Sequence, residues 1–236
     1  LFRSIPSEGP VSPKMEKELI RAYYATVSYL DALIGELIGT LDNLGLRDNT
    51  SIVLWSDHGF FLGEHGFWCK HHTFQEAIHV PLIISSPKKK KNVKSDALVE
   101  YIDIYPTVSE LAGIEPPDYI HGKSLVPILE SKQNDFKTEI YSRYQFREVV
   151  QDYNYSYHEI LNYDKFYLDR RGARTPSVDS NARIGGYMLF DMKNDIKQSV
   201  DISKDPKNKD IVEKYSEKLK KMREFSNQPI VIKWKK

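Results

Sequence analysis

The chain is constrained most strongly by one junction, where the apolar segment Ile52–Trp55 runs directly into Ser-Asp-His-Gly at residues 56–59. A short run of β-branched and aromatic side chains is typical of a strand that is buried on both faces. Asp57 and His58 therefore stand where a buried strand ends. In open α/β sheets ligands bind outside the carboxyl ends of the strands. A plain polar turn, in which Asp57 caps the next segment, explains this dipeptide equally well.

The residues that follow favour a site over a plain turn. Glu64 and His65, between two glycines, form a second acid–imidazole pair, and Lys70 comes shortly afterwards. So many ionisable groups beside one strand end are unusual for an ordinary connection. The sequence therefore predicts a cluster that faces a metal ion or an anion.

Composition excludes several classes of protein. The chain has 236 residues, of which 40% are hydrophobic, and its net charge is +1. These values are ordinary for a soluble globular protein and give no sign of a nucleic-acid partner. No apolar run approaches the roughly 18 residues that a membrane span requires. A single cysteine, Cys69, excludes a disulfide within the chain.

Residues 13–130 alternate helical and strand patterns. Ser12 and Pro13 are typical of a helix start, and a 3.6-residue apolar period continues to Gly45. Buried strands are expected at residues 52–55, 80–85 and 98–102, and short helices after residues 72, 103 and 122. This alternation predicts an α/β fold, with part of a mainly parallel sheet flanked by helices. We expect residues 1–135 to belong to one large domain.

The pattern changes after residue 135. Short aromatic and β-branched runs separated by polar turns predict a small antiparallel sheet. Its strands are expected at residues 139–144, 148–151, 155–160, 165–168 and 187–190, with a long loop at 169–186. An apolar stripe on a lysine-rich background predicts a C-terminal helix near residues 206–226. Residues 136–236 thus form a predicted small C-terminal subdomain.

Asp57 and His58 can offer one oxygen and one nitrogen to a divalent cation. Two adjacent ligands rarely hold a metal alone, because Ca²⁺ takes about 6–8 mostly oxygen ligands. Further carboxylates are needed, and none in the chain has a matching spacing. Zinc held by His58, His65, His71 or His72 is an alternative, but no HExxH or CxxC spacing supports it.

Two further side chains in this stretch have both a functional and an ordinary interpretation. Lys70 can hold an anionic group as a point charge, although a solvated surface lysine is the default for any lone lysine. Lys70 could also lower the pKa of its neighbour Cys69, but no Cys–His–Asn arrangement accompanies that thiol. The lysine block at 88–91 favours a solvated loop, with contact to a sulfated polyanion as the alternative.

Against this background the sequence resembles the sulfatase family along almost its whole length. Ser-Asp-His-Gly at 56–59, Leu-Gly-Glu-His-Gly at 62–66, and Trp68 with Lys70 look like the family's second signature. Further landmarks follow in the family's order. They are residues 79–83, 103–107 with 111–113, 122–125, and 187–191 with 194–195. Within the family, Asp-His and Gly-Glu-His-Gly look most like the iduronate-2-sulfatase branch.

The resemblance implies roles for matching residues. Asp57 and His58 would be two ligands of the family's calcium ion, and Lys70 would be a catalytic residue that binds the sulfate group. Phe60 and Trp68 would lie at the rim of a pocket for a sulfated carbohydrate. The family's nucleophile is a formylglycine made from the cysteine of a Cys-x-Pro-Ser-Arg motif. The family would place the protein outside the cell, in the periplasm or in a lysosome.

The chain also departs from the family pattern. Cys69 is followed by Lys-His-His, so it is not the formylglycine precursor. The family's early paired aspartates and early histidine have no counterpart either. We therefore expect this chain to be the C-terminal portion of a sulfatase, to need the missing N-terminal portion as its partner, and to be inactive alone. A phosphonate or phosphodiester hydrolase of the same superfamily and a non-catalytic fragment that binds sulfated glycans are the alternatives.

Overall fold

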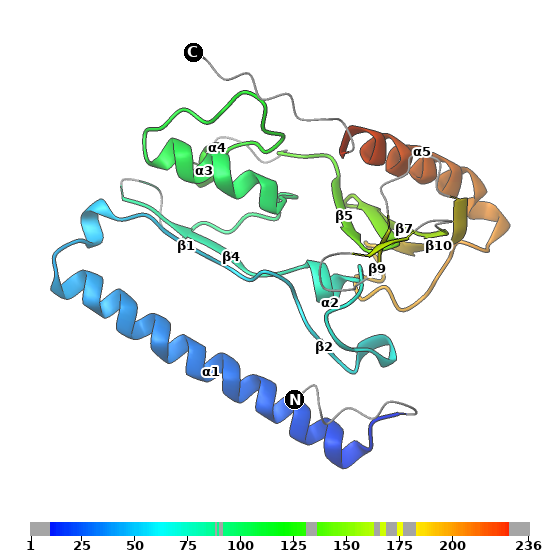
Figure 1. Cartoon of the computed structure of the whole chain (residues 1–236), viewed down its shortest axis with the longest axis horizontal. Coiled ribbons are helices and arrows are strands. Elements are labelled where there is room, and N and C mark those ends of the chain that lie inside the picture. Colours follow the sequence, from blue (N-terminus) through cyan, green and yellow to red (C-terminus); the bar gives the residue numbers. More distant parts are fainter. Residues whose placement is uncertain are drawn as a thin grey trace. The chain divides into compact units, whose positions relative to one another are not determined.

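The computed structural model describes residues 10–87, 89, 92–130, 136–162, 166–168, 174–176 and 183–226 (Figure 1). The chain divides into two compact units. The first contains Leu1–His71 and Glu76–Lys89, and the second contains His72–Gln75 and Lys90–Lys236. These units differ from the predicted domains 1–135 and 136–236. Those domains were predicted as parts of a larger protein, and they stay a prediction. The lysine block at 88–91 lies, apart from Lys89, outside the described residues.

The long amphipathic helix of the first unit is confirmed as α1, Pro13–Asn43. Ser12 caps it by accepting a hydrogen bond from the backbone N–H of Met15 at 3.3 Å, and Pro13 occupies the first turn. Leu19 is its buried residue. Beyond Leu19 several apolar side chains of the helix are exposed, including Val27, Leu30, Leu33 and Leu37. No helix in the described part of the chain is both long and apolar enough to cross a bilayer.

The mainly parallel sheet is not confirmed. Strands β1, Ile52–Trp55, and β4, Leu82–Ser85, pair with each other in antiparallel register, with Ile52 opposite Ser85 and Trp55 opposite Leu82. Parallel neighbours need a crossover connection, usually a helix that returns along the strands. The connection here contains one helix of four residues, α2, Gln75–Ile78, which is too short to return along a strand. The alternation in the sequence was therefore misleading about strand direction.

A small hairpin occupies the rest of that connection. Strand β2, Phe61–Leu62, pairs antiparallel with β3, Trp68–Cys69, so that Phe61 lies opposite Cys69. The turn between them contains Gly63 and Gly66, both with positive φ. Glycine tolerates this region because it has no Cβ. The hairpin folds the chain back and brings residue 70 close to residues 58–60 in space.

In the second unit, the strand expected at 98–102 is wrong. A 3₁₀ turn forms there at Tyr101–Asp103, followed by α3, Ile104–Leu111, and later α4, Val126–Leu129. The reason is the fully buried side chain of Asp103, whose Oδ2 accepts the backbone N–H of Glu100 at 2.8 Å. A backbone donor that is satisfied locally in this way is withdrawn from a strand ladder.

Asp103 also ties the segment around Gly122 to this turn. Its Oδ1 accepts the backbone N–H of Lys123 at 2.9 Å, and Lys137 Nζ lies 2.8 Å from its Oδ2. A Cβ on Gly122 would lie 1.8 Å from the carbonyl oxygen of Ile102, so only glycine fits. The two sequence landmarks at 103–107 and 122–125 are thus partners in one structural contact.

The small antiparallel sheet and the C-terminal helix are confirmed. The sheet has the order β10-β7-β6-β5, and the helix α5 is Lys209–Ser226. The strands are β5, Ile140–Tyr144, β6, Arg147–Gln151, β7, Tyr155–Asn162, and β10, Arg183–Asp191. A separate pair joins β8, Phe166–Leu168, to β9, Arg174–Pro176. The loop expected at 169–186 is therefore wrong at 174–176 and 183–186, and its other residues lie outside the described part.

Helix α5 lies against the sheet (Figure 1). The layer between them is partly apolar and partly ionic. The apolar part is a buried cluster of Val150, Tyr157, Leu189, Tyr215 and Leu219. The tyrosine-rich strands supply aromatic bodies to this core, while their hydroxyl groups find polar partners. Burial and then the charge of Glu159 raise the pKa of Tyr157, which therefore stays protonated and donates to Glu159 at 3.2 Å.

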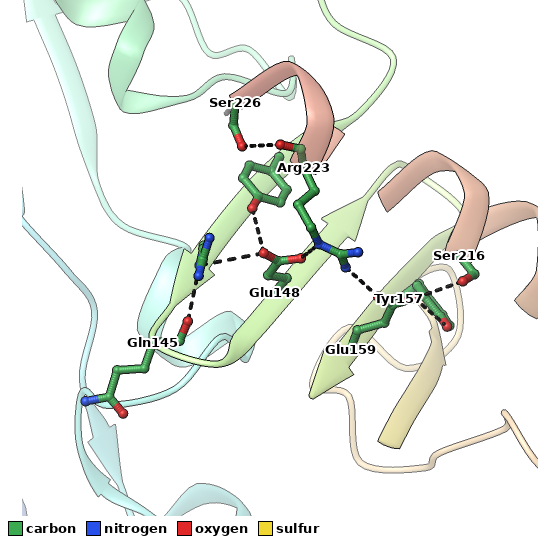
Figure 2. Close-up of polar contacts among 9 residues, drawn as sticks. Gln145, Glu148, Tyr157, Glu159, Ser216, Arg223 and Ser226 are labelled. Carbon is green, nitrogen blue, oxygen red and sulfur yellow. Dashed lines mark hydrogen bonds and ion pairs between the residues drawn. The ribbon is translucent and has the colours of Figure 1, made fainter. Parts of the chain in front are cut away.

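Figure 2 shows the ionic part of this layer, where Arg223 of α5 lies between two buried glutamates of the sheet. Its Nε lies 2.7 Å from Glu148 Oε2 and its Nη2 lies 2.6 Å from Glu159 Oε2. Burial by itself would lower the pKa of Arg223, but the two carboxylates outweigh that effect and raise it. Arg143 Nε adds a second positive charge 3.6 Å from Glu148. The buried charges are thus compensated within the layer.

Replacement of Arg223 by alanine tests this layer. The change leaves Glu148 and Glu159 buried without their guanidinium partner. Loss of one partner of a buried ion pair costs about 3–5 kcal/mol, and we expect the free energy of unfolding in urea to fall by that amount. Lys209→Ala is the control, because its contact with Glu213 at 3.8 Å is exposed and such pairs contribute about 0–1 kcal/mol. Equal, small losses in both variants would contradict the account.

Candidate active site

The end of β1 places Asp57 and His58 side by side. Ser56 Oγ donates to the carbonyl oxygen of His58 at 2.6 Å, which closes a tight polar turn directly after the strand. The Asp57 side chain is 82% exposed, whereas that of His58 is 30% exposed. Asp57 Oδ2 lies 3.4 Å from His58 Nε2. The predicted pair therefore presents an oxygen and a nitrogen at one place.

The hydrogen bonds of His58 define its tautomer. Its Nδ1 lies 2.8 Å from the carbonyl oxygen of Gly59, which can only accept, so Nδ1 carries the proton. Nε2 then has a free lone pair in the neutral ring. Metal-binding histidines are commonly oriented in this way, by a hydrogen bond from the other ring nitrogen to a carbonyl or carboxylate. His58 can thus offer the Nε2 lone pair as a ligand to a metal ion.

Lys70 joins this pair. Its Nζ lies 2.5 Å from Nε2 of His58 and donates to that lone pair. The hairpin explains the contact, since Phe61 pairs with Cys69 and so brings Lys70 back to the strand end. Cys69 itself has a φ of +78°, a conformation that costs about 1–3 kcal/mol for a residue other than glycine. The structure therefore brings together all three predicted metal and catalytic residues.

The backbone of α2 lies directly against Gly59 and holds it in place. Its N–H donates to the carbonyl oxygen of Ala77 at 2.8 Å. A Cβ at this position would lie 2.0 Å from the carbonyl oxygen of Glu76, which is far inside van der Waals contact. The glycine of the Ser-Asp-His-Gly sequence is thus required by α2, which fixes the residue that follows His58.

Glu64 and His65, the second acid–imidazole pair predicted from the sequence, have different partners in the structure. Glu64 Oε2 accepts the backbone N–H of Leu62 at 2.6 Å, within its own turn. His65 instead faces Glu76, with its Nε2 3.4 Å from Glu76 Oε2. Glu76 was not predicted from the sequence, because nothing in its spacing connects it to the hairpin.

The two aromatic residues proposed for the pocket rim pack within the first unit. Phe60 stacks on Tyr23 of α1, with ring centroids 4.9 Å apart. Trp68 is half-buried in β3, and a Cβ on Gly63 would lie 3.5 Å from its ring. Contact of either ring with a substrate stays a prediction.

The Cys69 thiol is buried in the hairpin. Burial raises the pKa of this thiol, and the opposing effect of Lys70 is smaller. A thiol with a raised pKa is a poor nucleophile at neutral pH. This agrees with the expectation that Cys69 is not the catalytic nucleophile.

The donor set near Lys70 is incomplete for a metal ion. Within the part of the chain that the structure describes, no group of three or more His, Cys, Asp or Glu side chains is placed to hold a metal. The four histidines considered for zinc therefore do not gather there. Asp57 and His58 fit a cation site only as a partial contribution, with further oxygen ligands from elsewhere.

Comparison with known protein families assigns the chain. Residues 6–114 match the family described as Sulfatase, and residues 63–225 match N-sulphoglucosamine sulphohydrolase, C-terminal. Together these matches run from before α1 to the end of α5. The chain belongs to the sulfatase family.

Curated relatives are similar over about half of the chain. An N-acetylglucosamine-6-O-sulfatase from Bacteroides thetaiotaomicron is 44% identical over 117 residues, which are 49% of this chain and 21% of the relative. Human iduronate 2-sulfatase is 38% identical over 125 residues, 51% of this chain and 23% of the relative. The matched segments thus span less than a quarter of the length of these two relatives.

Solved structures show the same fold over more of the chain. BT4656, in complex with its substrate D-glucosamine-2-N,6-O-disulfate, superposes with a TM-score of 0.76 at 28% identity, covering 91% of this chain and 42% of that one. A phosphonate monoester hydrolase from Silicibacter pomeroyi gives a TM-score of 0.78 at 23% identity, covering 96% and 44%. The second likeness concerns the fold alone.

Gly59→Ala tests the approach of α2 to the strand end. The added Cβ must displace the Glu76 carbonyl, and we expect a loss of stability of about 1–3 kcal/mol, typical of overpacking. Gly35→Ala in α1 is the matched control, since a Cβ there meets nothing within 4 Å and alanine favours a helix by about 1 kcal/mol. Thermal unfolding of both variants measures the difference, and a stable Gly59→Ala protein would refute the contact.

Proposed function

We propose that this chain is the carboxyl-terminal part of a calcium-dependent sulfate-ester hydrolase that acts on a sulfated sugar of the glycosaminoglycan type. The observation that carries the proposal is the contact of Lys70 with His58 beside Asp57, in a chain of the sulfatase family. A cation, a neutral imidazole and a carboxylate at one strand end suit the binding of an anionic ester together with a metal ion.

Lys70 is the proposed sulfate-binding and catalytic residue. Its ammonium group offers three donors and a full positive charge, and in the structure one donor is used by His58. The remaining donors can bind sulfate oxygens. Negative charge develops on the leaving-group oxygen as the ester bond breaks, so a fixed cation beside the sulfate group stabilises the transition state more than the ground state.

Asp57 and His58 are the proposed contribution of this chain to a calcium site. Asp57 supplies a carboxylate oxygen, and His58 supplies the Nε2 lone pair that its Nδ1–H bond to Gly59 leaves available. Calcium would there polarise the ester and favour ionisation of the attacking hydroxyl group. With Nε2 of His58 given to the ion, the Lys70 ammonium group would be available to the sulfate.

The remaining parts of the site are proposed to lie outside this chain. The relatives are several times longer than the matched segment, and the described residues hold no complete metal site. The exposed apolar side chains of α1 support a larger protein that covers them. The formylglycine nucleophile and the other calcium ligands would come from the amino-terminal portion, so the chain alone is expected to be inactive.

The proposed substrate class follows from the relatives. They include an iduronate 2-sulfatase, an N-acetylglucosamine-6-O-sulfatase and a protein whose substrate is a disulfated glucosamine. All three are sulfated sugars, and the sequence resemblance favoured the iduronate-2-sulfatase branch. A 2-O-sulfated uronate or a 6-O-sulfated glucosamine is therefore the proposed substrate class.

Substitutions in the full-length protein test the proposal. The native upstream sequence is added, and the protein is expressed with a formylglycine-generating enzyme and assayed on both sulfated sugars. We expect Asp57→Ala to abolish turnover and Lys70→Ala to lower kcat/KM by about 10²–10³-fold, as for the loss of one transition-state donor. Lys207→Ala, an exposed lysine on the second unit, is the control and should keep full activity.

Other outcomes would favour the alternatives. Cleavage of a phosphonate ester but of no sulfate ester would support a phosphonate hydrolase, whose fold the chain shares. Salt-dependent glycan binding without turnover, unaffected by Asp57→Ala, would support the non-catalytic glycan-binding fragment.

A further inference from the structure

Glu76, in α2, contacts both segments that carry the candidate active-site residues. Its carbonyl oxygen packs against Gly59, where a Cβ would lie only 2.0 Å away, directly after His58. Its carboxylate Oε2 lies 3.4 Å from Nε2 of His65, in the turn of the β2–β3 hairpin. Lys70 follows the second strand of that hairpin. Glu76 therefore joins the segment of His58 to the segment of Lys70.

The His65–Glu76 contact is well placed to fix this arrangement. The two side chains are only 16% and 17% exposed, so water competes weakly for the contact. His65 has a φ of +55°, a conformation that persists in residues other than glycine when surrounding contacts hold it. The ring of Phe61, which is fully buried, meets the His65 ring edge-to-face at 6.3 Å. Side-chain contacts thus determine the shape of the turn.

From these contacts we infer that Glu76 and His65 form a positioning pair that sets the distance between Lys70 and His58. The inference rests on the proposed function, because it assigns the pair a role in that site. In this role neither residue touches the substrate or the ion. The pair acts through the backbone, with the Glu76 peptide holding Gly59 and the Glu76 carboxylate holding the hairpin.

Paired substitutions in the full-length protein test the inference. The variants are Glu76→Ala, Glu76→Gln and His65→Asn, and the double variant Glu76→Ala with His65→Asn. Asparagine tolerates the left-handed backbone region but is too short to reach Glu76. Loss of a residue that supports a catalytic group typically costs about 10–100-fold, so we expect the Ala and Asn variants to lose kcat by that factor. Glu76→Gln keeps an acceptor oxygen near Nε2 and should recover most of the rate.

Two readouts separate positioning from general stability. The double variant should be no slower than the slower single variant, because residues of one pair are not additive. Crystal structures of the parent and of Glu76→Ala should show Lys70 Nζ displaced by about 1 Å relative to His58, a shift that can cost 10²-fold in rate. Ser51→Ala is the matched control in the same unit. It removes only the hydroxyl contact with Ser86 at 2.8 Å and should leave both readouts unchanged.

Each outcome is decisive. Parental kcat in Glu76→Ala and His65→Asn, or a lower melting temperature with parental kcat, would overturn the inference. A Lys70 side chain that keeps its parental position in Glu76→Ala would overturn it whatever the activity. A parent that carries formylglycine but hydrolyses no sulfate ester would refute the proposed function, while the crystallographic comparison would still decide the positioning role.

Discussion

The backbone contact between α2 and Gly59 is the constraint on which the candidate site depends. The N–H of Gly59 donates to Ala77, and the missing Cβ leaves room for the carbonyl of Glu76. This approach fixes the polar turn after β1, and therefore the direction in which Asp57 and His58 leave the strand. The β2–β3 hairpin then returns the chain so that Lys70 reaches His58. The close approach of α2 to Gly59 and the pairing of β2 with β3 thus bring Asp57, His58 and Lys70 together in the candidate site.

The family landmarks divide into two physical kinds. Those at residues 56–70 place donors and charges at a strand end, where they can meet a ligand. Asp103 and Gly122 instead form a buried structural contact, with the carboxylate satisfying backbone N–H groups and the glycine lying against a carbonyl. In the second unit, Arg223 similarly joins α5 to the sheet through two buried glutamates. Buried charges of this kind specify how elements pack, at a high cost if one partner is lost.

The sequence predicted local features well and long-range ones poorly. Helix α1, its Ser12 cap, the strand at Ile52–Trp55 and the C-terminal sheet with α5 follow from periodicity and capping, which are local properties. The direction of β4 relative to β1 was not predictable, because it depends on how a short helix and a hairpin route the chain. The strand expected at 98–102 failed because the side chain of Asp103 takes a backbone donor. The pattern at the end of the strand pointed to Asp57, His58 and Lys70, and the family resemblance gave them expected roles, whereas Glu76 could be found only from its contacts in space.

In the proposed function, this chain supplies one cation for a sulfate group and two ligands for a calcium ion. A crystal structure of the full-length protein, soaked with calcium and a non-hydrolysable sulfate-ester analogue, tests it most directly. We expect calcium about 2.3–2.6 Å from an Asp57 oxygen and bound also by His58 Nε2. We also expect the sulfate group within hydrogen-bond distance of Lys70 Nζ, about 2.7–3.2 Å. A calcium ion held without Asp57 and His58, or a sulfate group bound away from Lys70, would contradict it.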